Sequence, residues 1–286
     1  VSAGWDPLRK YDSVVNADGR FGVTIPLSMM LGFAEDNKKV LVHARQRLTL
    51  RRSITDTNCY ETNAGATENC FVTLTHVSWR LPFLTPNDKL RLNLLRMVEQ
   101  NRRLRLPFRS WDVVEYPLVP QTTNHVWTIM AKTQLEKPRY VIVGFQTGRR
   151  DTATKSTSKF DHCNLQDIKV FIENESYPNE NLNVDFTKQQ YFLLYRMYAM
   201  FRESYYGKSA KAVLPPEKFK SDAPLAVIDC SRQNDAIKQG SVNIRVEFKT
   251  TQNVPANTRA FALILHDRIV EYNVLDNTVT VLDHVK

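Results

Sequence analysis

The sequence predicts an all-β protein with a few helices, in which antiparallel strands pack as sandwiches. Three observations lead to this fold class. Short apolar runs recur along the chain, separated by loops rich in Pro, Asn, Asp, Ser and Gly. These runs do not alternate regularly with helices, as they would in a parallel α/β sheet. One aromatic and apolar helical stretch, 187–207, stands apart from this pattern and needs a surface to cover it.

The composition is typical of a folded protein. The 286 residues suffice for one large or two modest domains, and 24% are charged while 42% are hydrophobic. No apolar run reaches about 18 residues, so we predict no membrane span. The first residues lack the apolar core of a signal peptide and an initiator Met. We therefore expect the numbering to start inside a longer or processed chain.

The charge and the cysteines leave two questions open. The net charge of +9 fits either an anionic partner or a solvated basic surface. Cys59, Cys70, Cys163 and Cys230 show no metal-ligand spacing, and the sequence predicts neither a metal nor a cofactor. Cys59 and Cys70 flank one loop and could pair in an oxidising compartment, although free thiols are the favoured interpretation.

Residues 1–85 offer about three strands. The apolar and polar residues of 38–53 alternate, which predicts a long amphipathic strand with Val40 and Leu50 on the same face. Residues 70–81 are its possible partner. Between the first strands, 25–39 predicts a short helix or turn.

A helix is predicted next, over 86–101. Thr85 can cap it, Pro86 fits its first position, and Asp88 favours the positive end of the helix dipole. Four arginines follow within eight residues: Arg102, Arg103, Arg105 and Arg109. We interpret this basic segment as the join between two modules.

The remainder of the chain predicts eight strands, as in a complete jelly roll. These are 111–116, 125–134, 139–147, 167–174, 225–230, 241–250, 259–272 and 278–283. The aromatic helix lies between the fourth strand and the fifth.

The ends of that helix carry recognisable signals. Thr187 and Gln190 form a capping box, Phe186 and Tyr191 form a hydrophobic staple, and Gly207 gives the stop. A stripe at helical spacing comprises Tyr191, Leu194, Tyr198, Phe201 and Tyr205. Only a narrow strip through Gln189, Arg196 and Glu203 is polar. We predict that the helix packs on the sandwich and that its excess apolar surface meets a neighbour.

Candidate catalytic groups are weak. His266 and Asp267 point to opposite faces of a strand, the 161–163 run is better explained as a loop cap, and 229–231 as a strand end. The sequence contains no phosphate-binding loop, dinucleotide fingerprint or HExxH. We predict that the protein is not an enzyme.

Two groups of arginines could contact phosphates: Arg102, Arg103, Arg105 and Arg109 in the first, and Arg149 and Arg150 in the second. Apolar residues alternate with the first group, which indicates ordered packing. These arginines could equally form ion pairs between modules or subunits.

Several long stretches resemble sequences of a known family and do not merely fit a strand pattern. Among them are "LEKPRYVIVGFQT", "VIDCSRQNDAIKQGSVNIRVEF" and "PANTRAFALILHDRIVEY". From about Arg20 onward the chain resembles double jelly-roll-like proteins of adintoviruses, polinton-like viruses and related endogenous copies in arthropod genomes. The resemblance implies a major capsid protein with tandem jelly rolls. Three copies would form a pseudo-hexameric capsomer of an icosahedral shell around a DNA genome. It implies no catalytic residues.

From this resemblance and the pattern we expect three segments: the end of a first jelly roll (1–85), a helix and basic linker (86–110), and a second jelly roll (111–286) with an inserted helix at 188–206. The first jelly roll would be incomplete. The expected partners are further copies, a penton or minor capsid protein, and packaged nucleic acid. The expected location is the virion, after assembly in the host nucleus or cytoplasm. The alternatives are a lectin-like binding module and a domesticated endogenous copy with a host role.

Overall fold

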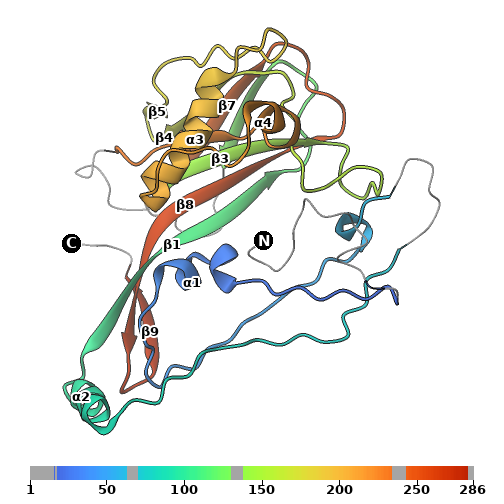
Figure 1. Ribbon diagram of the computed structural model, residues 1–286. Coiled ribbons are helices and arrows are strands. Elements are labelled where there is room, and N and C mark those ends of the chain that lie inside the picture. Colours follow the sequence, from blue (N-terminus) through green and yellow to red (C-terminus); the bar gives the residue numbers. More distant parts are fainter. Residues whose placement is uncertain (1–15, 17, 63–69, 130–137, 234–242, 283–286) are drawn as a thin grey trace. The chain divides into compact units, whose positions relative to one another are not determined.

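The computed structural model describes residues 16, 18–62, 70–129, 138–233 and 243–282 (Figure 1). The strands are β1 (Arg103–Tyr116), β2 (Asn124–Ile129), β3 (Pro138–Thr147), β4 (Leu165–Ile172), β5 (Glu175–Tyr177), β6 (Ala226–Asp229), β7 (Ile244–Thr250), β8 (Thr258–Asn273) and β9 (Thr278–Leu282). The helices are α1 (Gly32–Asp36), α2 (Asp88–Glu99), α3 (Phe192–Tyr206) and α4 (Pro216–Asp222), with short 3-10 turns at Leu27–Met29 and Thr57–Cys59.

The strands form two antiparallel sheets, which confirms the predicted fold class. One has the order β1-β8-β3-β6, with β9 beside β8, and the other has the order β2-β7-β4-β5. Strands that follow one another in sequence mostly lie in different sheets, so the chain crosses repeatedly between the two. This strand order is that of an eight-stranded jelly roll formed by β1 to β8.

The core lies between the sheets, and strands β2, β4 and β7 bury alternate residues on that side. In β2 the buried residues are His125, Trp127 and Ile129, and Trp127 is opposite Val246 of β7. Val246 is in turn opposite Val170 of β4. This register keeps apolar side chains on one face of the sheet.

Most predicted strands are confirmed, with two differences. The short strand β5 has no signal in the sequence, because three residues are too few for a recognisable period. The last predicted strand, 278–283, corresponds to β9, which pairs only with β8 rather than joining the main path of the sheet. Part of the predicted strand 125–134 lies outside the described residues.

The interpretation of 102–109 as a linker is wrong at the level of secondary structure, because β1 begins at Arg103. Leu104, Leu106 and Phe108 alternate with arginines, and Leu106 is buried. A period of two is that of a strand even when every second residue is charged. The three-segment division of the chain stays a prediction.

The predicted strands at 38–53 and 70–81 are absent from the described part of the chain, where neither segment pairs with another strand and the first bends at Val42 and His43. Val40 and Leu50 are exposed. Alternation alone does not make a strand, because its backbone groups also need a neighbouring strand. The short helix or turn predicted over 25–39 is confirmed by α1 and the turn before it.

The helix predicted over 86–101 is α2, but its cap differs from the prediction. The Oδ1 atom of Asn87, not Thr85, accepts the backbone N–H of Leu90 at 2.9 Å. Asparagine is among the best N-cap residues, and it lies directly before the helix.

The N-terminal prediction for α3 is also wrong. The helix begins at Phe192, and no side chain caps it. Asp185 instead accepts hydrogen bonds from the backbone N–H (2.9 Å) and hydroxyl (2.6 Å) of Thr187. This carboxylate holds a turn that closes with an isolated bridge between Asp185 and Gln190. Thr187 lies in this turn, five residues before the first helical residue, so it is too far from the helix to cap it.

The predicted stop is confirmed. Gly207 has a left-handed φ of 62°, and its N–H donates to the carbonyl of Glu203 at 2.9 Å. The rings of Phe186 and Tyr191 stack at 5.4 Å, as a staple pair would, although the contact precedes the helix.

The chain divides into two compact units. Unit 1 contains 1–45, 94–111 and 267–286, and unit 2 contains 46–93 and 112–266. The described core of unit 1 centres on Leu106, Tyr272 and Val274. Unit 2 holds the main core between the sheets. None of the helices in the described residues is long and apolar enough to cross a membrane.

Candidate interaction surfaces

The predicted stripe of α3 faces the protein's own sandwich. Leu194 and Tyr205 are buried, and α3 runs alongside β6. Tyr140 of β3 lies under the helix, with its ring 5.1 Å from that of Phe201 and 6.0 Å from that of Tyr205. β3 is therefore covered on both faces, which explains its nearly continuous burial.

The other end of the stripe packs on α4, which lies next to α3 in Figure 1. The ring of Tyr198 is 5.1 Å from that of Phe219, which is fully buried. The hydroxyl of Tyr195 donates to the carbonyl of Leu214 at 3.0 Å. The hydroxyl of Tyr191 points to the carbonyl of Pro216 at 3.5 Å. These contacts cover most of the stripe within a single subunit.

The opposite surface of α3 is the more exposed one. Phe192 is 72% exposed, and Leu193, Met200 and Tyr206 are 42–43% exposed. The sequence predicts that the stripe packs on the sandwich and that excess apolar surface meets a neighbour, and this exposed face is that excess surface. The sequence carries a signal for this face, because the apolar residues continue around the helix and leave only a narrow polar strip.

In unit 1, the basic cluster is largely ion-paired. The guanidinium groups of Arg103 and Arg105 lie 3.2 and 3.1 Å from the two carboxylate oxygens of Glu271. They hold the pKa of Glu271 below its usual range. Their side chains are still 63% and 74% exposed, and Arg102 is exposed as well.

Arg109 has a structural role. Its Nε donates to Asp36 at 3.0 Å, and its backbone N–H donates to the same oxygen at 2.8 Å. These bonds lower the pKa of Asp36. Gly32, at the start of α1, lies so close to Arg109 that a Cβ there would be 1.7 Å from the Arg109 carbonyl oxygen. Arg109 thus connects α1 to β1.

Arg149 and Arg150 belong to unit 2 and lie apart from that cluster in the sequence. Arg149 binds the carboxylate of Asp161 with both Nε (2.9 Å) and Nη2 (2.6 Å). Arg150 lies 3.8 Å from Glu115 and 3.6 Å from Asp151 and is 55% exposed. Arg149 is therefore mainly structural, and Arg150 remains accessible.

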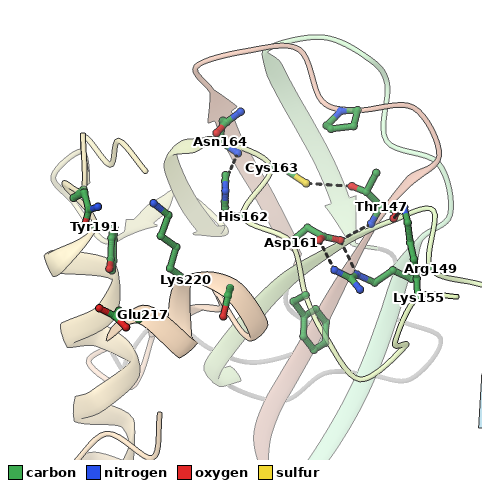
Figure 2. Close-up of a pocket in the computed structure, with 14 residues that line it drawn as sticks. Thr147, Arg149, Lys155, Asp161, His162, Cys163, Asn164, Tyr191, Glu217 and Lys220 are labelled. Carbon is green, nitrogen blue, oxygen red and sulfur yellow. Dashed lines mark hydrogen bonds and ion pairs between the residues drawn. The ribbon is translucent and has the colours of Figure 1, made fainter. Parts of the chain in front are cut away.

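A pocket of about 750 Å³ opens beside this ion pair (Figure 2). Its lining combines cationic, anionic and aromatic side chains from loops and from α4. The residues are Thr147, Arg149, Lys155, Phe160, Asp161, His162, Cys163, Asn164, Gln189, Tyr191, Glu217, Lys220, Ser221 and Pro255.

The geometry of the pocket suits binding better than covalent chemistry. Burial raises the pKa of the Cys163 thiol to about 11, which keeps it protonated. Burial and the nearby charge of Lys220 lower the pKa of His162, whose Nδ1 accepts the backbone N–H of Asn164 at 3.0 Å. A neutral imidazole beside a protonated thiol is not an activated nucleophile.

The remaining candidate groups have structural roles. Asp161 acts as the predicted loop cap, since it accepts the backbone N–H of Thr147 at 2.8 Å. Buried His266 bonds to Asp112 at 2.6 Å. Asp229 accepts the N–H of Ser231 at 2.8 Å, as a turn requires. The described residues contain no group of three or more side chains placed to hold a metal.

Comparison with known families gives one match, to the model of the double jelly roll-like domain, which covers residues 1–270. No curated protein matches the chain.

Several solved structures resemble the fold. PBCV-1 VP54, fitted into a reconstruction of the virophage Sputnik, has a TM-score of 0.40 and 10% identity over 70% of this chain and 55% of its own. The mavirus major capsid protein has a TM-score of 0.34 and 10% identity over 63% of this chain and 41% of its own. A quasi-atomic model of the PBCV-1 virus capsid has a TM-score of 0.39 and 7% identity over 68% of this chain and 55% of its own. The chain thus spans about half the length of these proteins.

Proposed function

Because the chain belongs to the double jelly roll-like family, we propose that it is a structural subunit of a viral capsid, a major capsid protein without catalytic activity. In this proposal three copies form a pseudo-hexameric capsomer, and capsomers tile an icosahedral shell around a DNA genome. The subunit resides in the virion after assembly in the host nucleus or cytoplasm.

The observation that carries the proposal is the strand order of the sandwich together with the family match. The sheets β1-β8-β3-β6 and β2-β7-β4-β5 enclose an apolar core. A shell subunit needs such a core and lateral surfaces that bind further copies. The exposed apolar residues of α3 supply one lateral surface.

Two further partners belong to the proposal. A penton or minor capsid protein would fill positions that the trimer cannot occupy. The exposed arginines Arg102, Arg103 and Arg105 would contact packaged nucleic acid, because their side chains keep accessible positive charge beside Glu271.

The test is expression of the full open reading frame, followed by light scattering with size-exclusion chromatography and by negative-stain electron microscopy. Trimers, or shells with trimeric units, are the expected result. A protein that remains monomeric at every concentration would overturn the proposal.

The pocket near Asp161 favours a second candidate, a lectin-like binding module. Its lining combines the aromatic ring of Tyr191 with polar groups such as Asn164 and Glu217, a combination that suits a hydroxyl-rich ligand. Glycan-array binding by a stable monomer would support this function over the capsid role.

A further inference from the structure

The outward face of α3 has a distinctive arrangement of charge. Arg196 and Glu203 are exposed between the apolar residues Leu193, Met200 and Tyr206. Within the described residues neither charged side chain has an ion-pair partner, although many other charged groups of the protein are paired. This face therefore combines apolar area with one free positive and one free negative charge.

The spacing of these residues has an internal symmetry. Arg196 and Glu203 are seven residues apart, which is two helical turns and about 10 Å at the rise of an α-helix. The midpoint between them lies at Ala199 and Met200. In an antiparallel pair of identical helices centred there, residue 196 of each copy meets residue 203 of the other.

We propose that this face of α3 binds the same face of a second copy, antiparallel and around a two-fold axis. Arg196 would pair with Glu203 of the partner subunit, and Glu203 with Arg196 of the partner subunit. Ala199 and Met200 would lie at the centre, where the small Ala side chain lets the helices approach, and Leu193 would flank the contact. A second copy satisfies both charges at once because the arrangement is self-complementary.

The contact deepens the proposed capsid role and rests on it. A trimer has a three-fold axis, so a two-fold contact cannot lie within it and would join neighbouring capsomers. One pair of 15-residue helices is a small interface, so each contact is weak and acts through repetition in the lattice.

Charge reversal tests the pairing. Arg196→Glu gives a face with two negative charges, and Glu203→Arg gives one with two positive charges. Each variant alone should associate about tenfold more weakly than the wild type, because like charges would meet twice. An equimolar mixture of the two should regain nearly wild-type association, since every contact then joins opposite charges. Sedimentation velocity and array formation by electron microscopy, both on the full chain, measure this.

The outcomes separate the contact from the function. Trimers in both single variants, with association between trimers lost and then restored by mixing, support the contact. Variants that associate like the wild type, or a mixture without recovery, overturn it and indicate that another partner covers α3. A wild type without trimers speaks against the capsid role instead. Circular dichroism confirms that each variant folds.

Discussion

The guanidinium of Arg149 binds the carboxylate of Asp161 through two nitrogens, at 2.9 and 2.6 Å. The same side chain donates to the carbonyl of Ser156 at 3.0 Å, and Asp161 also accepts the backbone N–H of Thr147. Both charged groups are largely buried, with 13% and 28% of their side chains exposed. The pair fixes the loop that follows β3. Arg149, which the sequence marks as a candidate for phosphate contact, therefore stabilises the folded structure.

Replacement of Arg149 with Ala should lower the free energy of unfolding by about 2 to 3 kcal/mol, because it leaves the charge of Asp161 without its main partner. Arg150→Ala is the matched control. Its side chain is 55% exposed and its contacts are long, so the loss should stay within about 0.5 kcal/mol. Urea unfolding measures both. Equal losses of unfolding free energy in the two variants would show that the ion pair of Arg149 stabilises the protein no more than the contacts of Arg150 do.

Gly32 offers a steric prediction. A methyl group at this position would be 1.7 Å from the Arg109 carbonyl oxygen, so Gly32→Ala must displace α1 from β1. We expect a loss of about 3 kcal/mol, the upper end for overpacking. Gly22→Ala is the control, because no atom lies within 4 Å of the added carbon. Thermal unfolding and limited proteolysis give the comparison. An unchanged Gly32→Ala melting temperature would contradict the close approach.

His162 predicts a pH dependence. Its pKa in the folded protein is lowered from 6.5, mainly by burial and also by Lys220. Below about pH 6.5 the unfolded chain therefore binds a proton more readily than the folded one, and stability falls as the pH falls. Above that pH the imidazole is neutral in both states and the effect vanishes.

The variant His162→Asn should flatten the fall in stability between pH 7 and pH 5, since Asn keeps an acceptor for the Asn164 N–H but does not titrate. His76→Asn, at an exposed position, should leave the slope unchanged. Some slope will remain in both variants, because burial also lowers the pKa of His125. Chemical unfolding at several pH values is the measurement, and an unaltered slope in His162→Asn would rule out this origin.

The cysteines predict a labelling pattern. Cys59 and Cys70 are free and exposed, whereas Cys163 and Cys230 are buried. In the native protein at pH 8 a thiol reagent should modify the first two and spare the other two, with all four reacting after denaturation. Mass spectrometry of labelled peptides assigns the sites. Rapid labelling of Cys163 in the folded protein would contradict its burial.

The exposed arginines at and just before the start of β1 predict an effect on packaging. Joint replacement of Arg102, Arg103 and Arg105 with Gln should reduce nuclease-protected nucleic acid in assembled particles while the subunit still folds, because these side chains are mostly exposed. Arg109→Gln should instead reduce folded yield, since its contact with Asp36 would be lost. Unchanged nucleic-acid content in the triple variant would exclude the contact.

The alternation of apolar and polar residues in the sequence was enough to predict most strands of the sandwich. Val246 and Phe248 of β7 alternate with polar residues and face the core, so their period predicts both the strand and its orientation. Gly207 marks the end of α3 because only a left-handed residue fits there. These features depend on local chemistry that a single sequence displays.

The predictions that were wrong or incomplete concern places where a local sequence pattern competes with another contact of the same residues. A capping box at Thr187 requires that the helix begin at the next residue, but Asp185 holds this segment as a turn and the helix begins only at Phe192. The arginines of β1 have the composition of a linker, but Glu271, 166 residues beyond Arg105, accepts them. The aromatic stripe of α3 does not reveal which surface covers it. Each of these outcomes depends on a distant or competing contact partner. Neither the composition nor the hydrophobic period of a segment identifies that partner.

The pairing of the strands determines when the sandwich can form during synthesis. β2 pairs with β7, β3 with β6 and β8, and β4 with β7, so each pair joins a strand made before α3 to a strand made after it. Contacts so distant in sequence form slowly. Until the ribosome has made β7 and β8, β2 has no strand to pair with and β3 and β4 each lack one neighbour, so the nascent chain is open to aggregation. The interval between the synthesis of β4 and that of β8 is therefore the period in which the chain most needs a chaperone.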